Sequence, residues 1–510
     1  MLAKILIIVV FFGITIFVGF YCRKHATDVD GFVLGGRSVG PWLTAFAYGT
    51  SYFSAVIFVG YAGQFGWKYG ISATWIGLGN AFIGSLMAWY VLGRRTRVMT
   101  RHLNSATMPS FFEKRFESKA LKIASSLIIF IFLIPYTASV YNGLSRLFGM
   151  AFDIPYTYCV VGMAVLTCIY VVVGGYMATA MNDFIQGLIM LFGIVMVIVS
   201  VLSGHGGFTE AIRKLSEISV PESNGISGSF VSFFGPDVLN LIGVVVLTSL
   251  GTWGLPQMVQ KFYAIKSEKA INKGAIISTI FAHVVAGGSY FLGGFGRLAA
   301  DGVATKANGS IDFDSIIPAM ISKLPDILIG IVVVLVLSAS MSTLSSLVLT
   351  SSSTMTIDFM KGTFAKNMSE KKQLVSMRIL VVVFVIVSSA IAIFQYYGNF
   401  AFIAQLMGIS WGALAGAFLA PFLYSLYWKK VTKAAVWASF AVGVGLTVSN
   451  MFFGYISSPI NAGAIAMVAG LVVVPLVSLV TPKMDRNKVD EMFSCYETKV
   501  LVSTKNSLEE

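Results

Sequence analysis

The sequence predicts an all-α polytopic membrane protein with about thirteen transmembrane helices. Of its 510 residues, 56% are hydrophobic and only 12% are charged, which is outside the range of soluble globular chains. Uncharged apolar segments long enough to cross about 30 Å of hydrocarbon recur from end to end. The net charge of +13 comes from Lys and Arg in alternate connections, which is a topology signal and predicts no nucleic-acid partner.

The apolar segments give the expected spans in order. They cover roughly residues 3–22, 41–65, 71–93, 122–148, 155–174, 183–203, 235–260, 271–295, 327–356, 374–396, 400–427, 433–454 and 460–481. The first could be mistaken for a signal peptide, but it lacks a small-residue cleavage site and is followed by Arg23 and Lys24. We therefore interpret it as a span. An odd number of spans places the two termini on opposite sides of the membrane.

The positions of Lys and Arg orient these spans. The connections after spans one, three, seven, nine and eleven, together with the tail, hold about 28 of the 36 basic residues. Loops rich in Lys and Arg stay in the cytoplasm, so these connections are expected inside. The prediction is a multi-pass protein of the plasma (inner) membrane with its N-terminus outside and its C-terminus in the cytoplasm.

Two spans contain residues that weaken a helix. The second carries GTSYFS at residues 49–54, and the seventh carries TSLGTWGLP at residues 248–256. Glycine permits unwinding and proline removes a backbone donor, so each segment is either an ordinary kink or a true break. The two lie five spans apart. Interruptions at matching positions in two halves indicate an inverted-repeat transporter whose binding site lies at the breaks.

The repeats give the expected organisation of the chain. It consists of a first extra helix with a cytoplasmic link (1–30), a first repeat of spans two to six (31–204), an extracellular loop (205–234), a second repeat of spans seven to eleven (235–428), two extra helices (429–482) and a cytoplasmic tail (483–510).

The ninth span contains an unusual cluster of hydroxyls, LSASMSTLSSLVLTSSST at residues 337–354. At about 100° per residue, one helix face carries Ala339, Ser342, Thr343 and Ser346, and an adjoining stripe carries Ser342, Ser345 and Ser346. Small hydroxyl residues often allow close helix packing in membranes. Neutral oxygens beside the free carbonyls of an unwound second span would instead suit a singly charged cation. The paired interruptions favour the cation interpretation.

Several separate stretches resemble the sodium:solute symporter family. They are GFVLGGRS at 31–38, VGG at 173–175 with NDFIQG at 182–187, GLPQ at 254–257, and ASMSTLS at 339–345. Their order and spacing extend the resemblance over roughly residues 5–480. It implies a leucine-transporter-type fold, a five-plus-five inverted repeat with flanking helices that works by alternating access. It also implies a first sodium site, which on this chain falls at Thr50, Phe53, Ala339, Ser342 and Thr343.

Some members of this family have a second sodium site. The matching positions here are Asp183 with Ser342, Ser345 and Ser346. The resemblance therefore implies one or two sodium ions per cycle. Asp183 could instead cap the start of the sixth span, because Asp is favoured at helix N-termini.

The resemblance places the solute between the two broken helices and the third core helix. The candidate contacts are Tyr52, Ile57, Tyr136, Tyr141, Thr248, Thr252 and Trp253. Each of these side chains could also serve packing alone. The polar pair of the sugar carriers is replaced by Val56 and Ile57, the arginine of the sialic acid carriers is missing near Tyr136, and the aspartate of the proline carriers is replaced by Tyr52.

These observations favour a sodium-coupled symporter that imports a small amino acid such as proline, pantothenate or a monocarboxylate. A sugar or sialic acid symporter remains an alternative, and so does a solute-gated channel or transporter-like sensor. No filter-like motif favours a channel, and the short tail leaves little room for a signalling domain. The sequence shows no nucleotide loop or metal-ligand cluster, so we expect no enzyme, no catalytic residues and no cofactor besides Na⁺. The expected partners are the lipid bilayer, the solute and sodium, with the monomer as the working unit.

Overall fold

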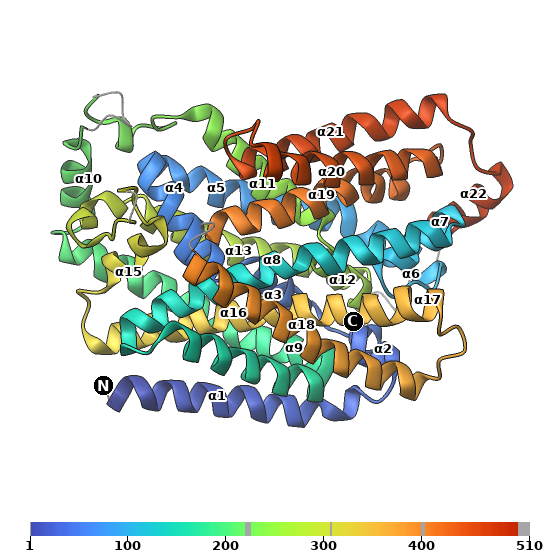
Figure 1. Cartoon of the computed structure of the whole chain (residues 1–510), viewed down its shortest axis with the longest axis horizontal. Coiled ribbons are helices and arrows are strands. Elements are labelled where there is room, and N and C mark those ends of the chain that lie inside the picture. Colours follow the sequence, from blue (N-terminus) through green and yellow to red (C-terminus); the bar gives the residue numbers. More distant parts are fainter. Residues whose placement is uncertain (1, 220–225, 307–308, 399–402, 498–510) are drawn as a thin grey trace, which may run out of the picture.

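The computed structural model describes residues 2–219, 226–306, 309–398 and 403–497 and is dominated by helices. Its long helices run along the long axis of the molecule, with α1 (Leu2–Cys22) on one side and α20 (Lys433–Phe453) and α21 (Pro459–Val480) on the opposite side (Figure 1). Within the described ranges the only β-type pairings are two isolated bridges. The predicted all-α class is confirmed. Residues 400–402 of the eleventh expected span and 498–510 of the tail lie outside the described residues.

Each of the expected spans is mainly helical over its described residues. In order they are α1; α3 (Pro41–Tyr52) with η3 (Val56–Tyr61) and α4 (Ala62–Tyr69); α5 (Thr74–Gly79), η5 (Asn80–Met87) and η6 (Trp89–Gly93); α8 (Lys119–Phe152); α9 (Tyr156–Gly204), which covers two; α11 (Val238–Gly254) with α12 (Pro256–Ala264); α13 (Lys269–Ala282), η9 (His283–Gly287) and α14 (Gly288–Gly293); α16 (Asp326–Thr354); α18 (Glu370–Gly398); α19 (Ile403–Tyr427); α20; and α21.

Length and hydropathy alone identify 10 helices in the described ranges that could cross a membrane, or 11 if the bent pair α11–α12 counts as one. Two mergers account for the difference between about thirteen spans and 11. Helix α9 holds two expected spans, and the helical run from Val56 to His102, which turns at Gly70 (φ 64°, ψ −141°), holds the end of the second span and all of the third.

Helix α9 folds back on itself at Gly175. This residue has φ 57° and ψ −150°, a conformation that side chains other than glycine's rarely adopt. Before it, the Tyr170 hydroxyl donates to the Met341 carbonyl of α16 at 2.6 Å; after it, Gly193 packs on Leu335 of the same helix. In a straight helix residues 170 and 193 would be about 35 Å apart, far more than the spacing of their two contacts on α16. The chain therefore passes α16 twice.

Both predicted interruptions are present as true breaks. Helix α3 ends at Tyr52, where Phe53 is extended (φ −89°, ψ 121°), and the Ser54 hydroxyl then accepts from Val56 N at 3.2 Å as the next half-helix starts. Helix α11 ends before Leu255, which is also extended (φ −81°, ψ 122°) because it precedes Pro256. The α11–α12 pair bends by 45° at that point.

The hydroxyl-rich helix α16 lies at the centre of the molecule. In its most apolar stretch 83% of the residues are buried, against 33% for α1 and for α18. Clustered hydroxyls are tolerated there because they face protein and not lipid. Helix α16 is therefore the element against which both broken spans are positioned.

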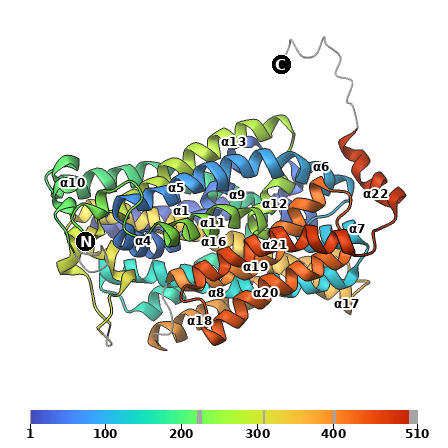
Figure 2. The same ribbon diagram turned by 90° about the horizontal axis from the view of Figure 1, so that it is seen from above.

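The connections rich in basic residues gather at one end of the molecule. Helices α6 (Arg94–His102), α7 (Met108–Phe116), α17 (Lys361–Thr363) and α22 (Arg486–Phe493) lie there, while α10 (Phe208–Ser216), α15 (Ile316–Ile321) and the start of α1 lie at the other end (Figures 1 and 2). Lys488 of α22 pairs with Glu117 at 2.8 Å, which ties the tail to this end. The alternation of charge along the sequence thus corresponds to two distinct ends.

Candidate functional site

Four backbone and side-chain oxygens converge where α3 breaks. The Thr343 Oγ1 of α16 lies 3.4 Å from the Thr50 carbonyl oxygen, 3.3 Å from that of Phe53 and 3.1 Å from that of Ala339. A hydroxyl has one proton, so it satisfies one of these acceptors and leaves the other carbonyl lone pairs facing the same point. The break supplies these carbonyls because Phe53 no longer continues the helix.

Ser342 is the fifth residue predicted for this oxygen cradle. Its side chain is 1% exposed, and its Oγ faces the Asp183 carboxylate but makes no hydrogen bond of good geometry within the described part of the chain. A hydroxyl without a good hydrogen bond in a membrane interior is costly unless a ligand uses it. The cradle offers uncharged oxygen atoms only, which fits a hard, singly charged cation such as sodium better than a divalent or a soft metal.

The second predicted group surrounds Asp183. This side chain is fully buried within the part of α9 that follows Gly175, well past its first turn, so it does not cap that helix. Neither carboxylate oxygen of Asp183 accepts a hydrogen bond of good geometry within the described residues, although the Ser342 hydroxyl lies beside it. On α16 the Ser345 hydroxyl donates to the Ser342 carbonyl at 2.9 Å, and Ser346 Oγ lies 2.7 Å from Ser51 Oγ.

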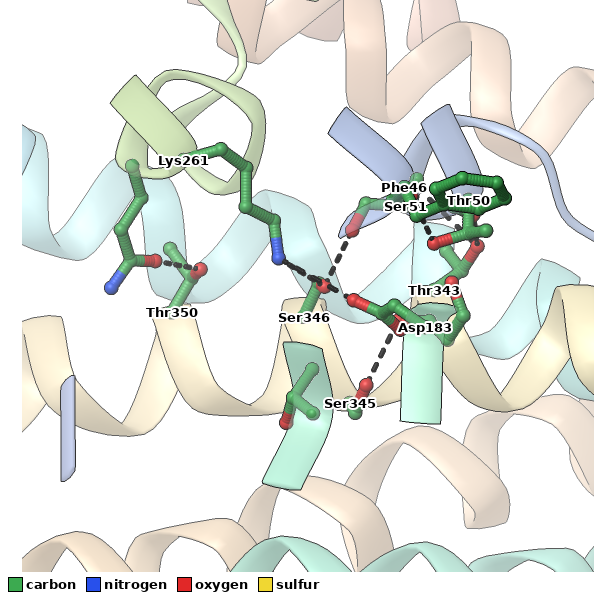
Figure 3. Close-up of polar contacts among 12 residues, drawn as sticks. Phe46, Thr50, Ser51, Asp183, Lys261, Thr343, Ser345, Ser346 and Thr350 are labelled. Carbon is green, nitrogen blue, oxygen red and sulfur yellow. Dashed lines mark hydrogen bonds and ion pairs between the residues drawn. The ribbon is translucent and has the colours of Figure 1, made fainter. Parts of the chain in front are cut away.

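A buried lysine stands beside this second group. Lys261 extends from α12 so that its Nζ lies 3.0 Å from Ser346 Oγ and 4.0 Å from Asp183 Oδ2 (Figure 3). Lys261 is not among the residues predicted for the site, because it directly follows the seventh expected span and resembles the basic residues of a cytoplasmic connection. A signal was present. Lys261 lies only one and a half turns after Pro256, about 7 Å along a helix, which is too short a distance to leave the protein interior.

A buried aromatic group lies next to the break in α3. Trp411 of α19 stands between Tyr52 and Tyr136, with ring centroids 5.8 Å and 5.9 Å away. The two hydroxyls and the indole Nε1 are buried and make no hydrogen bond of good geometry, although the Tyr136 hydroxyl faces Ser54 and Trp411. We call Tyr52, Tyr136 and Trp411 the aromatic cluster. The sequence analysis predicted the two tyrosines and missed Trp411, whose only signal was a large aromatic beside a glycine in the eleventh span.

Of the other predicted solute contacts, Thr248 lies beside the Tyr52 hydroxyl, whereas the remaining four do not join the aromatic cluster. The Thr252 hydroxyl donates to the Gly84 carbonyl at 2.9 Å, and the Trp253 indole donates to the Ile83 carbonyl at 2.9 Å, so both hold α11 against η5. The Thr248 hydroxyl donates within its own helix to Val244 at 2.9 Å. Ile57 is fully buried in η3, and Tyr141 faces α9 near Thr167 and Cys168.

The comparisons of this sequence with known proteins point to a single family. The profile of the sodium:solute symporter family matches residues 32–443. Sodium/proline symporters of Staphylococcus aureus, among them those of strains NCTC 8325 / PS 47 and COL, are 31% identical over 494 residues, covering 94% of this chain and 92% of theirs.

Two solved structures have the same fold. A Na⁺-coupled sialic acid symporter in a substrate-bound, outward-open state superposes with a TM-score of 0.76 at 17% identity, covering 95% of this chain and 99% of that one. Mhp1, a nucleobase-cation-symport-1 family transporter in a closed conformation with bromovinylhydantoin bound, gives a TM-score of 0.50 at 12% identity, covering 90% and 97%. The expected leucine-transporter-type fold is confirmed.

Proposed function

We propose proline as the solute of this chain, which belongs to the sodium:solute symporter family and carries a small solute together with sodium. The relatives that match nearly the whole chain are named sodium/proline symporters. The observation that carries the proposal is that the oxygen cradle and the aromatic cluster adjoin each other at the break in α3. Tyr52 of the aromatic cluster is directly followed by Phe53, whose carbonyl belongs to the oxygen cradle.

The sodium ion is proposed to bind in the oxygen cradle. Its ligands would be the carbonyls of Thr50, Phe53 and Ala339 and the hydroxyls of Ser342 and Thr343. Support comes from the convergence of these acceptors on Thr343 Oγ1 and from the buried hydroxyl of Ser342, which makes no hydrogen bond of good geometry. Because the cradle joins α3 to α16, a bound ion would hold these two helices together.

The aromatic cluster is proposed to enclose the solute. Its members are uncharged and buried, which suits a small, partly apolar ring such as that of proline. The two hydroxyls and the indole nitrogen, which make no hydrogen bond of good geometry, would supply the few polar contacts that orient it. The positive end of the half-helix after Ser54, next to the sodium ion, suits the carboxylate of an amino acid.

Ion and solute would be coupled through the break in α3. Sodium fixes the carbonyls of residues 50–53, and this same segment carries Tyr52 into the aromatic cluster. Each ligand thus stabilises the backbone conformation that the other requires, which is the condition for reciprocal coupling. All residues of both sites come from one chain, so we propose that the monomer is the working unit, in the plasma (inner) membrane with its tail in the cytoplasm.

Uptake by proteoliposomes tests this function. Radiolabelled proline should accumulate when an inward sodium gradient is imposed and not with a matched potassium gradient. Unlabelled proline should compete, whereas pantothenate, lactate, glucose and sialic acid should not. Competition by one of these compounds in place of proline would reassign the solute, and uptake without sodium would contradict the cradle.

A variant of the cradle provides the sharper test. Thr343→Ala removes one ligand and should raise the sodium concentration for half-maximal uptake about tenfold, the equivalent of about 1.4 kcal/mol. Thr447→Ala is the matched control. It deletes the same type of buried hydroxyl, one that donates at 2.9 Å to a carbonyl in its own helix α20, away from the cradle. Equal sodium dependence in the two variants would contradict the proposed sodium site.

A further inference from the structure

We propose that the Lys261 ammonium is the resident cation of the second site, so that this transporter carries its solute with a single sodium ion. The inference rests on sodium symport by this chain and does not depend on which solute is carried. It concerns the group around Asp183 and Ser346, which lies one helical turn along α16 from the oxygen cradle.

Lys261 contacts two of the four residues predicted for a second sodium ion, Asp183 and Ser346. Its Nζ lies 3.0 Å from Ser346 Oγ and 4.0 Å from Asp183 Oδ2 (Figure 3). It also stands over the Tyr176 ring, 5.1 Å from the ring centroid. The lysine is 2% exposed and the aspartate 0%. The ammonium carries one positive charge and three donors, so it meets the electrostatic requirement that a sodium ion would otherwise meet.

Neighbouring contacts fix Lys261 in this position. The adjacent Gln260 donates from Nε2 to the Val33 carbonyl at 3.1 Å and accepts from the Thr350 hydroxyl at 2.8 Å. Ser346, the acceptor for Lys261, also contacts Ser51 of α3 at 2.7 Å. Helices α3, α9, α12 and α16 therefore meet at the ammonium. A long flexible side chain that is packed in this way is not a mobile surface charge.

The charges leave no place for a second ion. A buried ammonium requires a carboxylate partner, and Asp183 is the only one within 4.0 Å of Lys261 in the described part of the chain. A sodium ion on Asp183 would lie within a few ångströms of the ammonium, and two cations would then share one negative charge. The oxygen cradle contains no lysine contact and stays available to sodium.

Counting sodium in the unmodified protein tests the inference directly. Equilibrium binding of ²²Na⁺ to purified full-length protein, without any solute, should saturate at one ion per chain. The sodium dependence of uptake should have a Hill coefficient of about one. One positive charge, that of the sodium ion, should cross the membrane with each molecule of a solute that has no net charge. Two ions per chain would overturn the inference. Because the binding assay contains no solute, a wrong assignment of proline would leave its result unchanged.

Variants of Lys261 give the second test. Lys261→Ser frees Asp183 and should raise the binding stoichiometry to two ions and the Hill coefficient towards two. Lys261→Arg retains the charge and should keep one ion. The double variant Asp183→Asn with Lys261→Met removes both charges at once and should also bind one ion. A folded Lys261→Ser variant that still binds one ion would overturn the inference, and if this variant does not fold, the count in the unmodified protein decides.

Discussion

Several residues at the centre of this molecule have buried polar atoms that make no hydrogen bond of good geometry. The hydroxyls of Tyr52, Tyr136 and Ser342 and the indole nitrogen of Trp411 are such atoms, although most buried polar atoms in proteins are hydrogen-bonded. Such atoms cost stability unless a ligand satisfies them. Those around the break in α3 lie next to the oxygen cradle, where a bound ion or solute could satisfy them.

Trp411 provides a prediction at this scale. Trp411→Ala removes the ring that separates Tyr52 from Tyr136 and should raise the KM for proline at least about tenfold, because an aromatic contact and its buried area are lost. Trp411→Phe keeps a ring and should change the KM by only about threefold. Transport kinetics in proteoliposomes measure both.

The control for this prediction is Trp437→Ala. Trp437 lies on α20 with 39% of its surface exposed. The Trp437→Ala variant should therefore have the same KM for proline as the unmodified protein. A Trp411→Ala variant with an unchanged KM would remove Trp411 from the solute site. Sodium binding in the absence of solute should be the same in all of these variants, because Trp411 contributes no atom to the oxygen cradle.

At the scale of elements, the sequence predicted the two breaks but not all of their contacts. Gly-Thr-Ser-Tyr-Phe-Ser and Gly-Leu-Pro are local signals, and helix breaking is a local property, so both interruptions were predictable. The cradle residues Thr50, Phe53, Ala339 and Thr343 were also predicted and do converge. Trp411 and Lys261 were missed because their roles depend on tertiary contacts with distant segments, which periodicity does not report.

The reversal within α9 gives the prediction at this scale. Gly175→Ala should destabilise the protein by about 1–3 kcal/mol, because φ 57° is unfavourable for alanine. The new Cβ would also lie 2.9 Å from Phe32 Cδ2 and 3.0 Å from the Phe32 carbonyl oxygen. Thermal unfolding of the detergent-solubilised protein should show a lower midpoint.

Gly162→Ala is the matched control for the reversal. Gly162 lies in the same helix, and a Cβ added there meets no atom within 4 Å. The unfolding midpoint should be unchanged or slightly higher, since alanine favours a helix. Equal midpoints for the two variants would mean that Gly175 is not required for the turn between the two halves of α9.

At the scale of the whole molecule, the charge pattern and the fold support each other. The positive-inside rule predicts from the sequence that the basic connections share one side of the membrane. The basic segments α6, α7, α17 and α22 lie together at one end of the molecule. The positions of the spans were predictable because hydropathy is a local property of the sequence, whereas the joining of neighbouring spans into one helical run was not. The pairing of helices was not predictable either, since lipid-facing and protein-facing apolar residues look alike in sequence.

The orientation is a prediction that chemical labelling can check. Ser457→Cys, between α20 and α21, and Asn487→Cys, in α22, each introduce an exposed thiol at opposite ends of the molecule. A membrane-impermeant maleimide should label the first in intact cells and the second only after permeabilisation. The protein without either substitution controls for its own cysteines. The reverse pattern would place the tail outside.

The contact between Lys261 and Asp183 also bears on how the protein is made. The ribosome releases Asp183 into the membrane with the first repeat, long before α12 and its lysine are synthesised. Until then the nascent chain carries a carboxylate whose permanent partner does not yet exist, and such a charge is expensive in hydrocarbon. The first half of the protein therefore depends on the second half for Lys261, the residue that pairs with its buried carboxylate. Synthesis as one uninterrupted polypeptide keeps that exposed period short.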